Sequence, residues 1–405
     1  MHRKMTRVLM ALVAMFVLAA CTNSGGEEPA AEETAAEEET TAAAAPSEEE
    51  SASEEPSEEE SEMASESEEP SEEESASEEP SEEGSESADS GTAQELIPAS
   101  GDVEECTYDG EPLELSDTVV GFSQSEAENN PFRIAETESI TETAEEIGVE
   151  QFIATNANTD LATQVADIQD LLAQGAELLI VAPLNSQGLE PALDQAAEQG
   201  VPVITIDRQL ESVPCEDYVT FIGSNFVEQG ARAAEQMVEA TGGEAQIAIL
   251  EGSPGNLVTT GRTDGFTEGI AGEAGMQVVA SQTGEFTREG GQQVTAQLIQ
   301  SNPDINAIYA ENDEMALGAL QALRDAGRVP GEDVQIVSID GTAEAVQAVV
   351  DGEIYAVIES NPRFGPLAFQ VAQDYLNGEP IPSELLIQDA EYTQENAEAD
   401  LQNAF

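Results

Sequence analysis

The chain has 405 residues, of which 85 are acidic and 11 are basic, so its formal net charge at pH 7 is −74. Such a chain has nothing with which to neutralise a phosphate backbone, which argues against nucleic-acid binding. Its one histidine is His2, near the N-terminus, so histidine-dependent catalytic triads are excluded as well. No phosphate-binding loop or metal-ligand motif is present in the sequence, and we expect no cofactor.

Residues 1–20 have the features of a signal peptide. Arg3, Lys4 and Arg7 precede the apolar run 8–20, which is too short to span a bilayer comfortably. The run ends in "LAAC", which resembles the lipobox of bacterial lipoproteins. That resemblance implies cleavage before Cys21, lipidation of its sulfur, and anchoring of the exported chain to the outer face of the cytoplasmic membrane. An ordinary signal peptide followed by a chance cysteine is the alternative.

We expect residues 21–115 to form an acidic stalk. The segment "PSEEESASEEPSEE" at 46–59 recurs unchanged at 70–83, and the surrounding chain is mostly Glu, Ser, Ala, Thr and Pro. Such a composition buries too little apolar surface to offset the entropy lost on ordering. A specific acidic binding tail is the alternative.

The composition after the stalk points to a salt-loving host. All eight basic residues of this part are arginines, and acidic residues greatly outnumber them. A large negative charge repels itself in dilute salt and favours solubility in concentrated salt.

Cys106 and Cys215 form an even pair in an exported protein, so we expect a disulfide between them.

From residue 118 onward, short apolar runs alternate with helical patterns. We expect strands at 118–123, 150–156, 178–183 and 201–207, with helices at 132–147, 165–175 and 189–199 between them. The pattern then starts again, with strands at 245–252, 276–284, 305–313, 334–341 and 354–360. Helices are expected between these at 229–240, 260–274, 288–300, 313–326 and 342–350.

This alternation predicts an α/β fold with two doubly wound lobes. Continuous apolar strands separated by helices are typical of parallel sheets that are buried on both faces. There are too many strands for one small sheet, so two lobes side by side fit better. Ligands of such folds bind where the carboxyl ends of the strands face a crevice.

Polar and aromatic residues follow the carboxyl ends of the predicted strands. Carboxylates and amides suit single hydroxyl groups, a guanidinium donates to two oxygens at once, and aromatic rings cover apolar C–H faces. This chemistry suits a sugar. The candidate ligand-binding residues are Asn130, Phe132, Arg133, Asp207, Arg208, Arg262, Phe286, Asn312, Asp340 and Glu359.

Each candidate also has a purely structural interpretation. Asp207 could cap a turn and pair locally with Arg208, and Asn312 could be the N-cap of the helix that follows it. Asp340 begins a common Asp-Gly turn, and single phenylalanines usually belong to the core. The functional interpretation depends on all of them converging.

The motifs together resemble a known family. "GFSQ" with "NNPFRIAET", "VPVITIDR", "GRTDGF", "TGEFTREGG", "YAENDEMALGALQALRDAG", "VSIDGT" and "IESNP" are similar, in order and spacing, to the sugar-binding components of ABC importers of the ribose-binding type. "FSQ", "RIAET", "GEFTR" and "SIDG" are most similar to the galactofuranose-binding member. "NNPF" resembles the ribose-binding version, so the sugar stays open between galactofuranose-, ribose- and galactose-like compounds.

The resemblance implies two lobes joined by three strands and closing around one sugar. The first lobe would comprise 116–222 and 361–388, and the second 223–360 and 389–405. The ten candidate residues would contact the sugar, with Glu359 placed near the hinge. The partners it implies are a monosaccharide and the subunits of an ABC permease, and we expect a monomer.

Two other functions stay open on the sequence. A sugar or autoinducer sensor that feeds a signalling receptor would use the same binding module. A glycoside-acting enzyme is weaker, because carboxylates are abundant everywhere in this chain and catalysis needs one tuned by burial.

Overall fold

The computed structural model describes residues 96–99 and 103–405. The predicted signal peptide, Cys21 and most of the predicted stalk lie outside these residues. Within the described ranges, no helix is long and apolar enough to cross a membrane. The described part of the chain forms two lobes, each built on one sheet.

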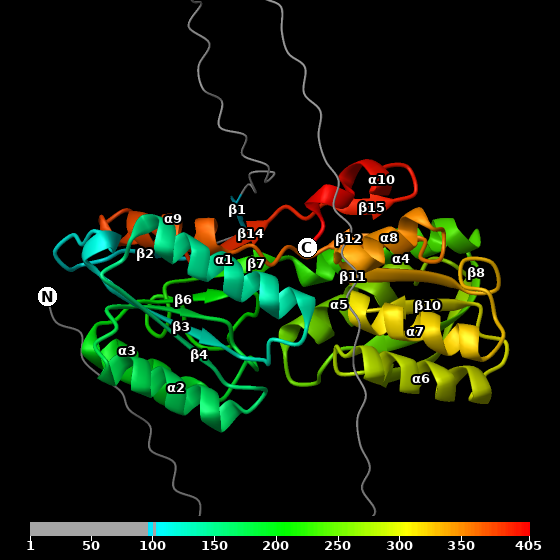
Figure 1. Cartoon of the computed structure of the whole chain (residues 1–405), viewed down its shortest axis with the longest axis horizontal. Helices are drawn as coiled ribbons and strands as arrows, with labels where there is room; N and C mark the ends of the chain where they lie inside the picture. The colour runs from blue at the N-terminus through cyan, green and yellow to red at the C-terminus, as the bar shows by residue number, and fades with distance from the viewer. Residues whose placement is uncertain (1–95, 100–102) are drawn as a thin grey trace, which may run out of the picture. The chain divides into compact units, whose positions relative to one another are not determined.

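The sheet of the first lobe has seven strands in the order β1-β14-β7-β6-β5-β3-β4 (Figure 1). All neighbouring strands in it run parallel except β1, which is antiparallel to β14. Every residue of β5 and of β6 is buried, as expected for strands covered on both faces. The strands are β1 (Leu96–Pro98), β3 (Val119–Gln124), β4 (Gln151–Asn156), β5 (Leu178–Val181), β6 (Val203–Ile206), β7 (Thr220–Ser224) and β14 (Glu384–Ile387).

Helices cover both faces of this sheet. Helices α1 (Pro131–Ile147) and α9 (Gly365–Leu376) pack on one face, and α2 (Leu161–Ala173) and α3 (Glu190–Gln199) cover the other. Helix α1 begins where it does because the Asn130 side chain accepts a hydrogen bond from the Phe132 N–H at 2.9 Å and because Pro131 suits the first helical position. This start fixes Phe132 and Arg133 in the first turn.

The second lobe repeats this architecture. Its six-stranded sheet has the order β15-β12-β11-β10-β8-β9, and only β15 is antiparallel to its neighbour. The strands are β8 (Glu244–Glu251), β9 (Gly275–Thr283), β10 (Ala307–Ala310), β11 (Gln335–Asp340), β12 (Ala356–Glu359) and β15 (Glu391–Thr393). The helices are α4 (Phe226–Thr241), α5 (Leu257–Gly269), α6 (Arg288–Ser301), α7 (Asp313–Asp325), α8 (Ala343–Val350) and the short α10 (Ala397–Asp400).

Helices α4 and α5 lie unusually close together, because glycines face the partner helix. A Cβ atom on Gly230 would lie 2.3 Å from the backbone oxygen of Arg262, and one on Gly265 would lie 2.0 Å from that of Val227. Both distances are shorter than atoms tolerate, so only glycine fits at these positions. The close approach sets the side chain of Arg262 directly against helix α4.

The chain passes between the lobes three times. The crossings run from β7 to α4, from β12 to α9 and from β14 to β15, that is, over residues 224–226, 359–365 and 387–391. The predicted lobe boundaries at 360/361 and 388/389 fall inside the second and third of these segments. The boundary at 222/223 falls within β7, just before the first segment. We refer to the three segments as crossings one, two and three.

Part of the predicted stalk instead belongs to the first lobe. Strand β1 pairs with β14, and β2 (Glu105–Cys106) pairs with β13 (Ile381–Pro382). Cys106 forms a disulfide with Cys215. Leu115 is buried and Leu113 packs against the same core cluster. The stalk prediction therefore extends too far, because this stretch carries apolar residues that the acidic repeats lack.

The element predictions also differ from the structure elsewhere. Helix α5 covers 257–269 rather than 260–274, because Asn256 caps it by accepting a hydrogen bond from the Thr259 N–H and a glycine-containing turn follows Gly269. Strands β7, β13, β14 and β15 and helices α9 and α10 were not among the predicted elements.

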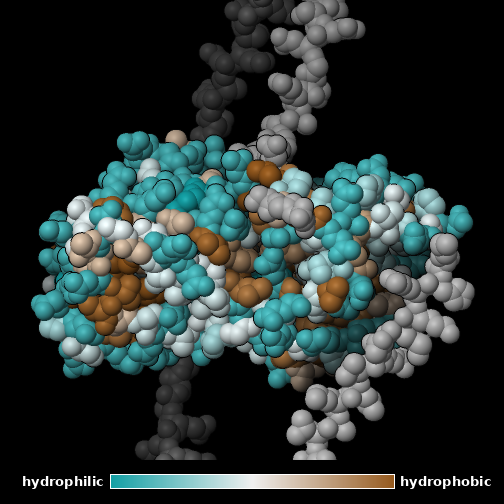
Figure 2. Space-filling model, turned by 180° about the vertical axis from the view of Figure 1, so that it is seen from behind, coloured by the Kyte–Doolittle hydropathy of each residue, from teal (hydrophilic) through white to brown (hydrophobic). Residues whose placement is uncertain are grey.

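Hydrophilic residues cover most of the face shown in Figure 2, and hydrophobic residues appear there as separate patches. The large hydrophobic side chains that are exposed are single residues scattered over different elements, including Ile97, Val227 and Val329. An isolated exposed hydrophobic residue is normal for a folded domain.

Candidate functional site

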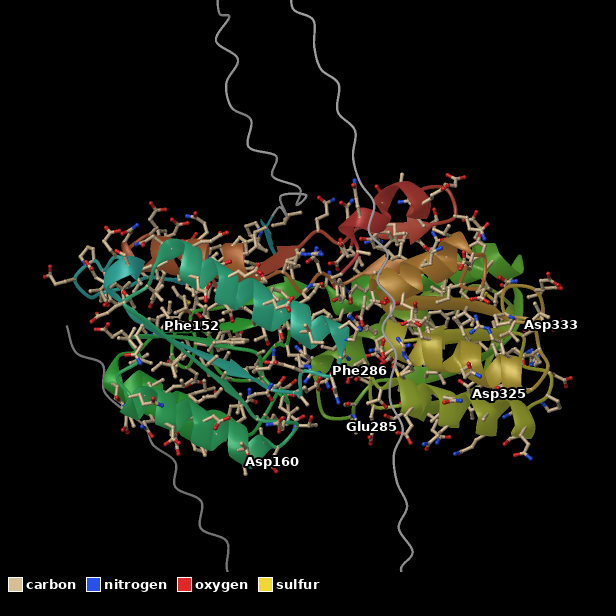
Figure 3. The ribbon with its side chains drawn as sticks, viewed as in Figure 1. Phe152, Asp160, Glu285, Phe286, Asp325 and Asp333 are labelled. Carbon is tan, nitrogen blue, oxygen red and sulfur yellow. A yellow bond between two sulfur atoms is a disulfide. The ribbon has the colours of Figure 1, made fainter. Side chains whose placement is uncertain are left out.

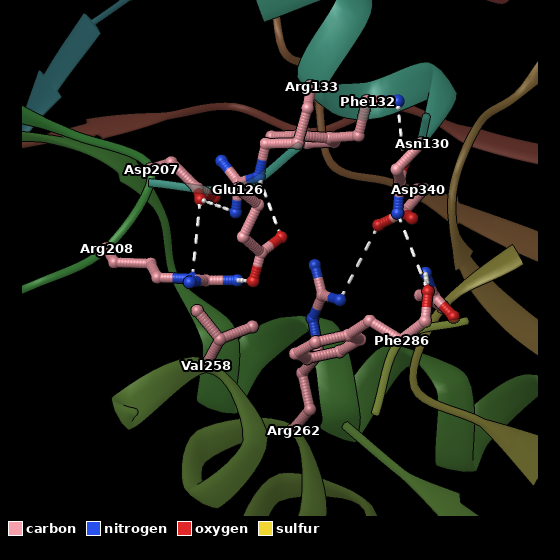
Figure 4. Close-up of a pocket in the computed structure, with 11 residues that line it drawn as sticks. Glu126, Asn130, Phe132, Arg133, Asp207, Arg208, Val258, Arg262, Phe286 and Asp340 are labelled. Carbon is pink, nitrogen blue, oxygen red and sulfur yellow. Dashed lines mark hydrogen bonds and ion pairs between the residues drawn. The ribbon is translucent and has the colours of Figure 1, made fainter. Parts of the chain in front are cut away.

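A pocket lies between the two lobes, beside the carboxyl ends of strands from both sheets (Figure 4). In each sheet one strand, β3 or β8, lies between the next two strands of the chain, β4 and β5 or β9 and β10. This change of direction is the switch point where α/β folds bind ligands. The pocket is a small space enclosed by polar, charged and aromatic side chains of both lobes. Its lining residues are Glu126, Asn130, Phe132, Arg133, Asp207, Arg208, Val258, Arg262, Phe286, Asn312 and Asp340.

The structure brings together all the predicted ligand-binding residues except Glu359. The first lobe contributes Asn130, Phe132, Arg133, Asp207 and Arg208, and the second contributes Arg262, Phe286, Asn312 and Asp340. All of these except Asn130 are buried.

Two arginine side chains of the first lobe meet at Glu126. Its Oε1 accepts a hydrogen bond from Arg208 Nη2 at 2.8 Å, and its Oε2 accepts one from Arg133 Nε at 3.1 Å. Arg133 Nη2 lies 2.7 Å from Asp207 Oδ2. Residues from the loop after β3, from α1 and from the end of β6 are thereby fixed relative to one another. Charge-assisted bonds of this kind hold side chains in one geometry.

The two glutamates of this cluster, Glu126 and Glu136, have pKa values shifted in opposite directions. Burial raises the pKa of Glu126, but the guanidinium groups of Arg208 and Arg133 outweigh it and lower the pKa to about 2. Glu136 lies behind Arg133 and accepts hydrogen bonds from Arg133 Nη1 and Gln124 Nε2, each at 2.8 Å. Burial raises the pKa of Glu136 to about 7, although Arg133 opposes the shift. Glu126 is therefore the ionised partner at neutral pH.

Arg262 is the corresponding cation of the second lobe. It points from α5 towards Asp340 at the end of β11, with 3.5 Å between Nη1 and Oδ1 (Figure 4). Nη1 also donates to the backbone oxygen of Glu311, and Nε donates to Gln229 Oε1 at 3.0 Å. Burial raises the pKa of Asp340 well above its usual value, with Arg262 opposing the shift.

Asn130 and Asn312 each cap a helix and also line the pocket. Asn312 Oδ1 caps α7 by accepting a hydrogen bond from the Met315 N–H at 3.0 Å, while its Nδ2 donates to the Phe286 backbone oxygen at 3.2 Å. Asn130 caps α1 and also reaches this Phe286 oxygen from the first lobe, at 3.5 Å. Phe286 thus connects the lobes at one end of the pocket.

Three pocket residues have backbone angles that are unusual for residues with a side chain. The φ angles are 64° at Asp207, 58° at Phe286 and 140° at Asp340. Asp340 is held by its neighbours, because the Asp313 carboxylate accepts hydrogen bonds from the N–H groups of Gly341 and Thr342 at 2.8 and 2.7 Å. Strained positions of this kind concentrate at ligand-binding sites.

One buried donor points to an occupant of the pocket. Arg208 Nε has no hydrogen-bond partner among the described residues, and Asp207 Oδ2 lies 3.6 Å from it. Arg208 is 2% exposed, so solvent does not satisfy this group freely. A ligand hydroxyl would supply the acceptor.

A wider hollow adjoins the pocket and shares Glu126, Asn130 and Phe286 with it. Asp160 at the start of α2 and Glu285, next to Phe286, line this hollow from the two lobes (Figure 3). It gives the pocket a polar mouth.

Glu359 lies outside the pocket lining, contrary to the prediction. Its carboxylate accepts hydrogen bonds from the Ala390 N–H at 2.9 Å, from Asn361 Nδ2 at 3.2 Å and from Tyr392 at 3.4 Å. The side chain is therefore turned towards crossing three, where it ties β12 to β15. Its position at a strand end was visible in the sequence, but its direction was not.

Two lining residues were missed. Glu126 carried no signal, because one glutamate in so acidic a chain is not informative. Val258 lies one helical turn before Arg262 on α5, and this spacing of four residues places both on one face. Among residues 96–99 and 103–405, no group of three or more His, Cys, Asp or Glu side chains is arranged to hold a metal ion.

Comparison with known proteins agrees with this geometry. Residues 120–380 match the periplasmic binding protein domain family. The chain is 36% identical to the ribose import binding protein RbsB of Bacillus subtilis over 263 residues, which are 65% of this chain and 83% of that protein. It is 31% identical to the galactofuranose-binding protein YtfQ of Escherichia coli over 272 residues, which are 66% of this chain and 85% of that protein.

A solved structure has the same fold. A protein from Mycobacterium smegmatis, crystallised in complex with β-D-fucofuranose, is 37% identical and superposes with a TM-score of 0.68. The match covers 71% of this chain and 94% of that one.

Proposed function

The chain belongs to the periplasmic binding protein family, and we propose that it is a lipid-anchored, exported protein that delivers a neutral monosaccharide to the permease of an ABC importer. The observation that carries this proposal is the pocket itself. Arginine, carboxylate, amide and aromatic side chains from both lobes converge on one buried space between them.

Binding to both lobes is what allows a sugar to close the protein. The sugar would bond to Arg133, Asp207 and Arg208 on one side and to Arg262, Asn312 and Asp340 on the other. A ligand shifts a conformational equilibrium only by its differential affinity for the two states. Since the second set is in reach only when the lobes are together, the sugar favours the closed state, which would dock on the permease.

The charges of the pocket favour a neutral sugar. Three guanidinium groups, those of Arg133, Arg208 and Arg262, face the three carboxyl groups of Glu126, Asp207 and Asp340. Glu126 and Asp207 already engage the guanidinium groups of Arg133 and Arg208. A sugar acid or sugar phosphate would compete with these carboxyl groups, and burying a charge that is not fully paired is costly.

The relatives indicate which ring form of the sugar should be tested first. Two of them are named for ribose and galactofuranose, and the crystallised one holds a fucofuranose. We therefore propose a pentose or hexose in its five-membered ring form. Phe132 and Phe286 would cover its apolar faces.

The test is titration calorimetry of the purified domain in high salt with D-ribose, L-arabinose and galactofuranose, and with galacturonate and ribose 5-phosphate as charged controls. We expect one neutral sugar to bind one-to-one and to be recovered chemically unchanged. Binding of only the charged sugars would contradict the proposal, and conversion of the sugar would indicate an enzyme. Sugar binding without stimulation of the cognate permease ATPase in proteoliposomes would indicate a sensor.

A further inference from the structure

Gln229 links the hinge to the pocket. It lies in the first turn of α4, directly after crossing one, and it is 1% exposed. Its side-chain amide makes three hydrogen bonds. It is not among the residues that line the pocket, and it is separated from the sugar site by Arg262.

Two of these bonds go to the hinge. Gln229 Nε2 donates to the Glu359 backbone oxygen at 3.1 Å, in crossing two, and to Asp389 Oδ2 at 2.8 Å, in crossing three. The other oxygen of Asp389 accepts a hydrogen bond from Ser224 Oγ at 3.0 Å, in crossing one. Gln229 and Asp389 therefore tie all three crossings together.

The third bond goes to the pocket. Gln229 Oε1 accepts from Arg262 Nε at 3.0 Å, and the guanidinium of Arg262 lies 6.0 Å from the centre of the Phe226 ring. The glycine contacts between α4 and α5 hold the two backbones close enough for this bond. Arg262 Nη1 extends from this support towards Asp340.

The amide has one permitted orientation. Turning it over would set its N–H groups against Arg262 Nε, which is also a donor, and its oxygen against the carboxylate of Asp389 and the carbonyl of Glu359. An amide has two donors on one atom and an acceptor on the other, so all three bonds would be lost together. The orientation that suits the hinge is thus the one that holds Arg262.

We propose that Gln229 is a positioning residue that couples the hinge to the sugar pocket. It holds Arg262 in the binding geometry when Glu359 of crossing two and Asp389 of crossing three both accept hydrogen bonds from its side-chain N–H groups. This inference rests on the proposed sugar-binding function. It assigns Asp389, which lines no part of the pocket, an effect on sugar affinity through Gln229.

The first experiment is a double-mutant cycle on sugar affinity with Gln229→Met and Asp389→Ala. Gln229→Met keeps the length of the side chain and removes its hydrogen bonds, and we expect about 10- to 100-fold weaker binding, the effect of one hydrogen bond to a charged group. Asp389→Ala should also weaken binding. The double variant should bind about as the Gln229→Met variant does, because Asp389 acts through Gln229.

The matched control is Gln373→Met. Gln373 also bridges two backbone groups, with Oε1 accepting from the Leu115 N–H and Nε2 donating to the Leu113 oxygen, but it lies on α9 away from the hinge network. Its substitution should lower the melting temperature and leave sugar affinity unchanged.

A charge exchange gives a second test if either variant fails to fold. Gln229→Glu keeps an acceptor for Arg262 but faces Asp389 with a second carboxylate, so it should weaken binding. Adding Asp389→Asn restores a donor-acceptor pair and should recover a large part of the lost affinity.

The results separate the two proposals. If the wild type binds a sugar and Gln229→Met and Asp389→Ala bind it equally well, or if their losses simply add, the coupling is overturned and the sugar-binding function stands. If the wild type binds none of the sugars tested, both proposals fall. Loss in each single variant without further loss in the double supports the coupling.

Discussion

Glu126 Oε1 accepts a hydrogen bond from Arg208 Nη2 across 2.8 Å, although 82 positions of sequence separate the two residues. The bond joins the loop after β3 to the end of β6, on the two sides of the first-lobe switch point. Because the other oxygen of Glu126 accepts from Arg133, this one carboxylate binds both cations that the first lobe contributes to the pocket. The rim of the pocket is thus organised before a sugar arrives, which lowers the entropy lost on binding.

Glu126→Gln should lower sugar affinity by about tenfold or more, because an amide has one acceptor where the carboxylate has two and its N–H groups face a guanidinium. Calorimetry with the sugar found by screening measures this. Glu128→Gln is the matched control, because Glu128 is an exposed residue of the same loop and lines neither the pocket nor the wider hollow. Equal affinities of the Glu126 and Glu128 variants would contradict the assigned role.

Arg208→Ala should lower sugar affinity by at least about 100-fold. The substitution removes a buried charged group that would donate to the ligand and that donates to Glu126. The melting temperature should fall modestly, since the Leu184 oxygen also loses the hydrogen bond from Arg208 Nη1. Arg324→Ala removes the same charge from an exposed pair with Glu353 and should change neither quantity appreciably. An Arg208 variant that binds sugar like the wild type would remove Arg208 from the site.

Replacing both Cys106 and Cys215 by serine should lower the free energy of unfolding by about 2–5 kcal/mol, because the disulfide closes a long loop in the unfolded chain. The loop spans 109 residues. Denaturant melts with and without reductant measure the effect, and sugar affinity should not change, since neither cysteine lines the pocket. Two thiols titrating in the unreduced wild type would show that the bond does not form.

Stability should fall as the pH rises from about 5 to 8. Burial raises the pKa of Glu136, Glu311 and Asp389 to about 7 and that of Asp313 to about 6. Between the unfolded values near 4 and these folded values, the folded protein holds more protons than the unfolded chain, so raising the pH favours unfolding.

Glu126 changes the stability with pH in the opposite direction. Its pKa is lowered to about 2, so the stability that it contributes is present above about pH 4.5 and is lost as the pH falls towards 2. We therefore expect the highest melting temperature of the sugar-free protein near pH 5. Melts should be run in high salt, which screens the exposed carboxylates. Asp389→Asn should shrink the difference between pH 5 and pH 8, and a melting temperature that rises over this interval would refute the expectation.

Much of this protein could be read from local patterns. The buried strands β5 and β6 are the unbroken apolar runs "LLIV" and "VITI", and helices α1, α2 and α7 start at Asn or Asp residues that cap them. A strand of a parallel sheet ends at the crevice, so residues that directly follow such runs are expected there from their position alone. Asp207 and Arg208 follow such a run, and both line the pocket.

Other features depended on the tertiary structure. The sequence places Glu359 at a strand end, but packing against β15 turns its carboxylate away from the pocket. Glu126 is one glutamate among many until Arg133 and Arg208 come within hydrogen-bonding distance of it, and Gln229 acquires its three partners from helix α5 and two crossings. Backbone periodicity is encoded within a few residues and can be read along the chain. The direction of a side chain and its distant partners are decided only when separate segments of the chain pack together.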